Sequence, residues 1–454
     1  MRRKESLKRL LILGLSFLGI ILVTLLYAYT WIEQYHQRYI YNVKLFFWGH
    51  ILMVFVYFVL LFFFNTTYGG MKVGYLKPMD VFFSQVFSLL CVNVITYMQL
   101  SLMEVKLVWM KGILWMTVEQ ILFSLVWTYL CNFVYRKAFP PRDLFLIHGD
   151  RSIADITRKF ASRPDKYKVV KTAHINEGIS WIKGEILQGK MAVVLWDIPT
   201  PDRNVLLKFC YSKSIRVYMM PKITDVLVKG ADQLHLFDTP ILLSREVSLK
   251  IEQRIAKRLI DIFCSLVLLI ISLPIQIITA ILIKAYDKGP VLYKQIRCTE
   301  GEREFEILKF RSMRVDAEKD GVARLAAKND DRITPIGKFI RTVRIDELPQ
   351  LYNILKGDMS FIGPRPERPE IIAQYMEEMP EFALRMKVKA GLAGYAQVYG
   401  KYNTTPYDKL KLDLSYIENY SLWMDIKLML LTLKILFKPE STEGVEGSQT
   451  TAMK

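Results

Sequence analysis

The sequence predicts a multidomain membrane protein with a four-helix transmembrane bundle, an α/β domain and a charged C-terminal domain. Three observations predict this organisation. Four apolar runs of about 20 residues open the chain, β-rich and helical segments then alternate, and a fifth apolar run precedes a region dense in Arg, Pro and acidic residues. With 454 residues, of which 52% are apolar, the chain is too long for one domain and too apolar to be wholly soluble.

The composition also limits the classes of partner. A formal net charge of +18 suits anionic membrane lipids and phosphorylated substrates, and the apolar runs favour these over nucleic acid. The five cysteines are scattered, with no CxxC or CxH spacing. We therefore expect no nucleic-acid partner, no disulfide framework and no zinc.

The apolar runs of the first 140 residues predict the bundle. The first run follows the basic segment MRRKESLKRL, but it is too long for a signal peptide and lacks a small-residue cleavage site, so it is an anchor. Ten Lys and Arg flank one side of the bundle and four the other, which places both ends of the bundle in the cytoplasm. Within the fourth run, we favour hydrogen bonding between helices for Glu119 and Gln120 over a functional acid. The runs cover residues 10–32, 45–64, 81–102 and 113–134.

Residues 141–250 predict a parallel, doubly wound α/β domain. The β-rich runs DLFLIHGD, YKVVKTAHI, MAVVLWDIP and SIRVYMMP are separated by helical stretches such as ISWIKGEILQGK. After the first strand only Gly149 stands where a dinucleotide site needs several glycines. We therefore favour a Rossmann-like fold kept for regulation or assembly over one that binds a cofactor.

The fifth apolar run, residues 259–283, contains Pro274. If this run crossed the membrane, the domains before and after it would face opposite sides. Proline removes a helix hydrogen bond and kinks the axis, so the segment can instead enter and leave by the same face. We expect a re-entrant helix over residues 259–284, and a fifth span is the alternative.

The rest of the chain carries ordered motifs, among them GPVLYKQIR, FEILKFRSM, RIDELPQLYNILKGDMSFIGPRPERPE and LDLSYIENYSLWMDIKL. Over residues 254–437 these motifs resemble the bacterial polyprenyl-phosphate sugar-1-phosphate transferases. The resemblance is to the long form of these monotopic phosphoglycosyl transferases, which carries four N-terminal membrane helices and initiates exopolysaccharide or capsule synthesis. It implies a mainly α catalytic domain with a small β element over residues 251–438, on the cytoplasmic side of the bacterial cell membrane in a multi-pass protein.

The resemblance implies an activity and a catalytic pair. Such enzymes transfer a sugar-1-phosphate from a UDP-sugar to undecaprenyl phosphate through a phosphoaspartyl intermediate, release UMP and require Mg²⁺. Asp346 matches the nucleophile and Glu347 its partner, and both are the expected metal ligands. A carboxylate that attacks an anionic phosphoryl group needs that charge neutralised by magnesium and arginines. The same residues also read as an Asp-capped helix start with Gly357 as its C-terminal stop, and both interpretations can hold.

Basic and acidic residues around the pair are the expected substrate-binding set. Arg365 lies between two prolines, so its backbone is stiff and suits a diphosphate, although a solvated arginine in a proline turn is the alternative. Lys309 and Arg311 lie on a predicted strand, and Asp425 also reads as a helix cap. The full set is Lys309, Arg311, Arg341, Arg344, Arg365, Asp413 and Asp425.

Two other function classes stay open. A metal-dependent membrane glycosyltransferase that releases UDP would need an Asp-x-Asp motif, and none occurs in this sequence. A non-catalytic membrane scaffold would leave the motifs between Lys309 and Arg368 without a cause. A second copy of the chain is a further candidate partner. Residues 439–454 read as a disordered tail. The motifs do not indicate which sugar is transferred.

Overall fold

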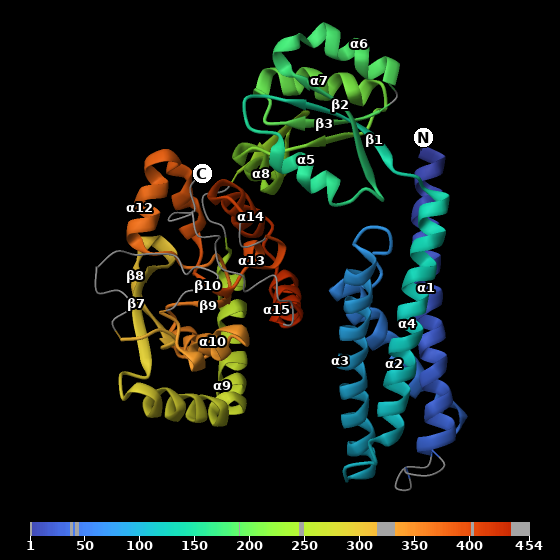
Figure 1. Cartoon of the computed structure of the whole chain (residues 1–454), viewed down its shortest axis with the longest axis vertical. Helices are drawn as coiled ribbons and strands as arrows, with labels where there is room; N and C mark the ends of the chain where they lie inside the picture. Colours follow the sequence, from blue (N-terminus) through green and yellow to red (C-terminus); the bar gives the residue numbers. More distant parts are fainter. Residues whose placement is uncertain are drawn as a thin grey trace. The chain divides into compact units, whose positions relative to one another are not determined.

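The computed structural model describes residues 2–36, 40, 45–189, 191–244, 249–315, 332–400 and 404–436, with side chains from residue 7 onward. The chain divides into two compact units, Met1–Met220 and Pro221–Lys454. It is mainly helical, with several small sheets, and its N-terminal part consists of apolar helices, as the sequence predicts (Figure 1). The domain boundary expected at residue 250 stays a prediction, and the expected tail at 439–454 lies outside the described residues.

The first unit begins with long apolar helices that lie side by side (Figure 1). Each of the four predicted runs coincides with one of them, although the run 10–32 continues past α1 and the run 45–64 begins two residues before α2. Each helix is long and apolar enough to cross a membrane. The first continues into a π-helical turn, η1 (Trp31–His36). The helices are α1 (Arg2–Thr30), α2 (Phe47–Tyr68), α3 (Pro78–Glu104) and α4 (Lys111–Ala138).

Polar side chains join three of these helices in their interior. Gln120 of α4 is fully buried; its Oε1 accepts from Asn93 Nδ2 of α3 at 3.0 Å, and its Nε2 donates to the Tyr57 hydroxyl of α2 at 3.0 Å. In a membrane the surrounding lipid is as apolar as the side chains, so the hydrophobic effect does not hold helices together, and interhelical hydrogen bonds contribute to their association. Helix–helix hydrogen bonding is thus confirmed for Gln120, whereas Glu119 is exposed.

A four-stranded parallel sheet of order β2-β1-β3-β4 follows the helices. Alternate residues of β1 point to opposite faces: Phe145 and Ile147 pack with α6 and α7, and Leu144 and Leu146 pack with α5. All four predicted strands are present, with helices on both faces of the sheet. The elements are β1 (Arg142–His148), α5 (Ala154–Ala161), β2 (Tyr167–His174), η2 (Ile175–Glu177), α6 (Ile179–Gly189), β3 (Ala192–Trp196), α7 (Thr200–Ser212) and β4 (Val217–Met219).

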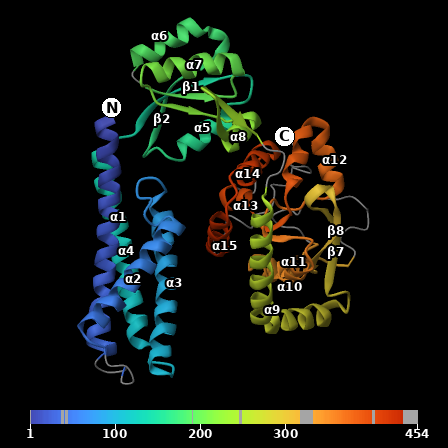
Figure 2. The ribbon, with the colours of Figure 1, turned by 180° about the vertical axis from the view of Figure 1, so that it is seen from behind.

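The second unit begins with α8 (Ile223–Gly230), an antiparallel hairpin of β5 (Asp232–Leu236) and β6 (Thr239–Leu243), and the long helix α9 (Ile251–Asp287). Helix α9 is the fifth helix long and apolar enough to span a membrane. It contains Pro274 and bends sharply in both views (Figures 1 and 2). Proline at this position removes one backbone donor and displaces a carbonyl of the preceding turn, which accounts for the bend.

The remaining elements surround one core that contains Ile354, Met359, Phe382 and Leu414. Strands β7 and β8 form an antiparallel pair, and β9 and β10 form a parallel one. The elements are β7 (Leu292–Cys298), η3 (Glu300–Glu302), β8 (Glu304–Phe310), α10 (Pro335–Thr342), η4 (Ile345–Glu347), α11 (Gln350–Lys356), β9 (Ser360–Ile362), α12 (Pro369–Glu378), η5 (Pro380–Lys387), β10 (Gly391–Ala393), α13 (Tyr395–Tyr399), α14 (Pro406–Glu418) and α15 (Leu422–Leu436).

Two adjacent basic residues near the start of α9 bind it to this core. Lys257 Nζ lies 2.8 Å from the Ile362 carbonyl of β9 and 2.6 Å from Oδ2 of Asp425 on α15. Arg258 donates to the carbonyls of Ile354 and Leu355 at the C-terminal end of α11, each at 2.6 Å. These bonds fix the apolar helix to three elements of the second unit.

Candidate active site

The Asp346–Glu347 pair lies in the short 3-10 turn η4, between α10 and α11. The turn is entered through Arg344, whose φ of 56° is in the left-handed region, which costs a non-glycine residue about 1–2 kcal/mol. Helix α11 begins later, with Pro349 at its N-cap, and ends at Gly357 in the left-handed region. The Gly357 stop is therefore confirmed, but the interpretation of Asp346 as the cap of this helix is wrong, because Asp346 belongs to the preceding turn.

Three cations surround the carboxylate of Glu347. Its Oε1 lies 3.2 Å from Arg365 Nη2 and 3.5 Å from Lys309 Nζ of β8, and its Oε2 lies 3.6 Å from Arg344 Nη1. Burial alone would raise the pKa of Glu347, but Arg365, Lys309 and Arg344 outweigh it and hold the pKa below its usual range. Glu347 is thus a charged residue around which the basic side chains are arranged.

Asp346 is in a different environment. Among the described residues, no cation lies within ion-pair distance of its carboxylate. Burial and the charge of Glu347 raise the pKa of Asp346 above its usual range, against the opposing charges of Lys309, Arg341 and Arg344. A pair of carboxyl groups whose pKa values are moved apart can serve two roles. Here the anion of Asp346 is the less stabilised of the two and so the more reactive.

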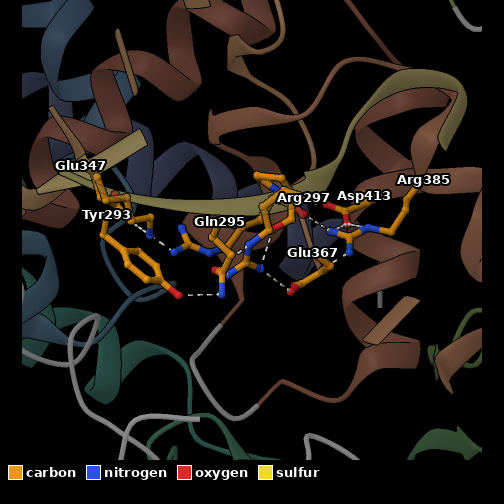
Figure 3. A network of polar contacts seen from close by, with 10 residues as sticks. Tyr293, Gln295, Arg297, Glu347, Glu367, Arg385 and Asp413 are labelled. Atoms are coloured by element: carbon orange, nitrogen blue, oxygen red, sulfur yellow. Dashed lines mark hydrogen bonds and ion pairs between the residues drawn. The ribbon is translucent and has the colours of Figure 1, made fainter. Parts of the chain in front are cut away.

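A second layer of charged residues, which includes Arg385 and Asp413 (Figure 3), contacts the Arg365 backbone. Arg385 of η5 binds the buried Asp413 of α14, with 2.8 Å between Nη2 and Oδ2, and also donates to the backbone carbonyl of Arg365 at 3.0 Å. Asp413, a predicted substrate-binding residue, therefore reaches the pair only through Arg385 and the Arg365 backbone.

Glu367 lies between two arginines in the same layer (Figure 3). Its Oε2 is 3.6 Å from Arg297 Nη1 of β7, and its Oε1 is 3.9 Å from Arg385 Nη1. Sequence reasoning missed Arg297, Glu367 and Arg385 as site residues. Arg297 and Glu367 lie inside motifs that the sequence singled out, so the motifs themselves were a usable signal; Arg385 has no such local mark.

Two other predicted residues have partners elsewhere in the second unit. Arg311 pairs with Asp287 at the end of α9. Asp425 accepts from Lys257, from the Tyr416 hydroxyl at 2.7 Å and from the Tyr420 hydroxyl at 3.2 Å. The structure thus brings together Asp346, Glu347, Lys309, Arg344 and Arg365, with Arg341 close enough to influence the Asp346 charge, while substrate binding by Arg311 and Asp425 stays a prediction.

The carboxylate pair also fits the chemistry of a magnesium ion. Mg²⁺ is usually held by one or two protein carboxylates together with substrate phosphates and water. Asp346 and Glu347 supply two carboxylates beside cations that suit phosphate. No group of three or more His, Cys, Asp or Glu side chains gathers within metal-binding distance in the part of the chain that the structure describes.

Comparison with known proteins agrees with this geometry. The model of the family described as "Bacterial sugar transferase" matches residues 252–439. A UDP-N-acetylgalactosamine-undecaprenyl-phosphate N-acetylgalactosaminephosphotransferase of Aeromonas hydrophila is 38% identical over 50% of this chain and 53% of its own length. A UDP-glucose:undecaprenyl-phosphate glucose-1-phosphate transferase of Klebsiella pneumoniae is 38% identical over 45% of this chain and 43% of its own length.

A shorter relative is matched over most of its length. A putative undecaprenyl-phosphate N-acetylgalactosaminyl 1-phosphate transferase of Bacillus subtilis is 51% identical over 29% of this chain and 72% of its own length. By contrast, the chain spans only about half the length of the Aeromonas and Klebsiella proteins. The residues matched by the family model, 252–439, include the carboxylate pair and its cations.

Proposed function

The chain belongs to the bacterial sugar transferase family, and from this membership we propose that it transfers a sugar-1-phosphate from a UDP-sugar to undecaprenyl phosphate. The names of its relatives supply both substrate classes. The observation that carries the proposal is the unequal carboxylate pair: three cations hold Glu347, whereas none of the described residues places a cation within ion-pair distance of Asp346. The product would be the lipid-linked sugar on which an exopolysaccharide or capsule is built.

In the first half of the reaction, an oxygen of the Asp346 carboxylate attacks the phosphorus that carries the sugar. The bond from that phosphorus to the oxygen bridging to the uridine phosphate breaks, and its electron pair leaves with UMP. A phosphosugar remains esterified to Asp346. Burial favours this step, because an anion that has lost its water shell has less solvation to give up when it attacks.

In the second half, an anionic oxygen of undecaprenyl phosphate attacks the same phosphorus. The bond from phosphorus to the Asp346 oxygen breaks, the carboxylate is restored and undecaprenyl diphosphosugar is released. Both halves pass through a phosphoryl group with spread negative charge, which fixed cations stabilise. Lys309, Arg344 and Arg365 are placed for this by their ion pairs with Glu347, and Arg341 adds its charge next to Asp346.

A divalent cation would complete the charge balance. Asp346 and Glu347 are the residues that would hold Mg²⁺ together with diphosphate oxygens, and the ion would neutralise charge on the leaving group. The cations that already contact Glu347 keep that carboxylate ionised and so ready to act as a ligand.

The lipid acceptor requires a site at the membrane surface. The bend of α9 at Pro274 supports a re-entrant helix in the cytoplasmic face of the plasma membrane (Figure 2). Polar bonds inside this segment satisfy groups near the bend: the Ser272 hydroxyl donates to the Leu268 carbonyl at 2.6 Å and accepts from Gln276 Nε2 at 2.8 Å. Lys257 and Arg258 would then hold the catalytic core next to the headgroups.

A nucleotide assay tests the function directly. The full-length protein is reconstituted in lipid with undecaprenyl phosphate and supplied in turn with UDP-glucose, UDP-galactose and UDP-N-acetylgalactosamine. We expect UMP release that depends on one of these sugars, with a matching lipid diphosphosugar. Release of UDP in place of UMP would instead indicate a glycosyltransferase, and absence of both products with the whole panel would favour a scaffold.

A further inference from the structure

Three side chains on one face of β7 lie next to the carboxylate pair and have no role in the chemistry above. Tyr293, Gln295 and Arg297 alternate along the strand and so point to the same side of it. Tyr293 is directly opposite Lys309 of β8, whose ammonium group contacts Glu347. Opposed residues of antiparallel strands lie on one face with their Cβ atoms about 5 Å apart. We call these three residues the β7 stripe.

Hydrogen bonds hold the β7 stripe in one arrangement (Figure 3). Arg297 donates twice to Gln295 Oε1, from Nη2 at 2.6 Å and from Nε at 3.1 Å. Gln295 Nε2 in turn donates to the Tyr293 hydroxyl at 3.2 Å. Arg297 also donates to the Pro366 carbonyl at 3.1 Å, one residue after Arg365. The stripe is therefore ordered relative to Arg365 before any ligand binds.

The direction of these bonds decides what the Gln295 amide can recognise. Arg297 has only donors, so the amide oxygen must face it, and two donated bonds occupy both lone pairs of that oxygen. The amide nitrogen carries two hydrogens, of which one is directed to Tyr293. What Gln295 offers to a ligand is therefore a donor, which matches a carbonyl oxygen and not an amino group.

The neighbourhood of the stripe also favours an anion. Burial and the charges of Arg365 and Arg368 lower the pKa of Arg297 to about 10, against Glu367. Lys309 Nζ and Arg365 Nη2 also come close to one carboxylate, at 3.5 Å and 3.2 Å from Glu347 Oε1. The repulsion of Arg297 by Arg365 and Arg368 shows that cations are crowded here, and an anionic group placed among them relieves that repulsion.

We infer that the β7 stripe is the subsite for the base of the donor nucleotide. The uracil ring lies on Tyr293, and the uracil carbonyl at the position where cytosine has its amino group accepts from Gln295. Arg297 is a positioning residue that fixes the amide. Tyr293 is 37% exposed, and an exposed aromatic residue is a common platform for a base. With the base there, the diphosphate extends toward Lys309 and Arg365. This inference rests on the proposed function, because a UDP-sugar donor provides its ligand.

The donor character of Gln295 predicts a choice between pyrimidines. Uracil has a carbonyl at the ring position where cytosine has an amino group, and an amino group facing the Gln295 amide hydrogen would leave two donors opposed. We expect the protein to bind UDP at least about five-fold more tightly than CDP, the size of one lost hydrogen bond. UDP and CDP carry the same phosphates, so the comparison isolates the base.

Calorimetric titration of the full-length protein in detergent tests the subsite with UDP and CDP as probes. Gln295→Ala should remove the preference for UDP, and Gln295→Glu, which replaces the amide donor with an acceptor, should shift it toward CDP. Tyr293→Ala should weaken both nucleotides by about ten-fold, while Tyr293→Phe keeps most of the affinity. Lys294→Ala is the matched control, because Lys294 is exposed on the opposite face of β7, where it pairs with Glu306 at 3.0 Å.

The outcomes separate the subsite from the catalytic proposal. The ratio of UDP to CDP affinity is measured within one sample, so partial unfolding of a variant does not change it. A wild-type protein without preference for UDP, or a Gln295→Glu variant with the wild-type ratio, would overturn the inference. If the wild type prefers UDP and the variants respond as expected but no lipid product forms with any UDP-sugar, the proposed function fails while the subsite stands.

Discussion

Asp346 and Glu347 are neighbours in one 3-10 turn, yet their surroundings move their pKa values in opposite directions. The nucleophilic form of Asp346 is the deprotonated one, and burial together with the charge of Glu347 raises its pKa. Protonation therefore begins at a higher pH than for an ordinary aspartate. We expect the rate of UMP release at saturating donor to fall on acidification while Glu347 is still ionised. The pH profile of the initial rate checks this.

A variant without the negative charge of Glu347 is the control for the pH profile of UMP release. Glu347→Gln removes the charge that, together with burial, raises the Asp346 pKa, so the acid limb should move to lower pH in whatever activity the variant retains. A limb that stays in place would assign the titration to another group.

Asp346→Asn should abolish UMP release, with a loss of at least about 10³-fold, because the variant keeps the shape of the side chain and removes the attacking anion. The readout is UMP released from UDP-sugar without acceptor, together with radiolabel from the sugar-bearing phosphate trapped on the protein. Label should appear in the wild type and be absent in the variant. Near-normal turnover in Asp346→Asn would rule out the covalent route at this residue.

Arg365→Ala should lower kcat/KM by about 10²-fold, because it removes a cation from Glu347 and from the transferred phosphoryl group. Arg365→Lys keeps the charge but not the planar fork and should lose less. Arg303→Ala is the control: Arg303 is exposed, and its partner Asp358, at 3.4 Å, keeps a second cation in Lys356 at 3.2 Å. Equal losses in the Arg365 and Arg303 variants would mean that the effect is structural.

Asp425→Asn should act mainly on stability, because it leaves the buried Lys257 ammonium group without its charged partner. Removing one member of a buried pair costs about 3–5 kcal/mol of unfolding free energy. The double variant Lys257→Met/Asp425→Leu should recover much of this loss, since neither charge then remains buried. Thermal unfolding of the three variants in detergent measures it. A stable Asp425→Asn protein with a raised KM for donor would instead favour substrate binding.

The re-entrant arrangement of α9 predicts where the residue after it lies. Pro290 is exposed just beyond the helix, and Pro290→Cys in a chain whose five cysteines are replaced by serine should resist an impermeant maleimide in intact cells. It should react in inverted vesicles. Leu107→Cys, in the exposed loop between α3 and α4, is the control expected to react from outside. Labelling of Pro290→Cys from outside would make α9 a fifth span.

The elements that the sequence predicts correctly have local patterns. Each apolar run at the start of the chain is longer than a buried strand or helix requires, and this length alone indicates a membrane helix. Strand β1 is a short apolar stretch bounded by turn residues, so it can be recognised without the strands that pair with it. The carboxylate pair and its arginines are also close in sequence, which is why the sequence could group Asp346, Glu347 and Arg344.

Features that depend on distant partners leave no such pattern. Asp425 reads locally as a helix cap, and only the fold brings Lys257, which lies 168 positions earlier, to its carboxylate. Arg385 is one basic residue among many until Asp413 and the Arg365 carbonyl are placed around it. The antiparallel β5–β6 hairpin was likewise missed, because its short runs lie within a region whose other strands are parallel.

The attachment of α9 to the core has a practical consequence for protein engineering. A truncation at Leu259, where the fifth apolar run begins, is one obvious way to isolate the second unit. Such a cut would remove Lys257 and Arg258, and with them the bonds to β9, α11 and α15. The shortest expression fragment worth making therefore begins upstream of both residues, at about Pro221, because Val226 of α8 and Leu249 also belong to the core of the second unit.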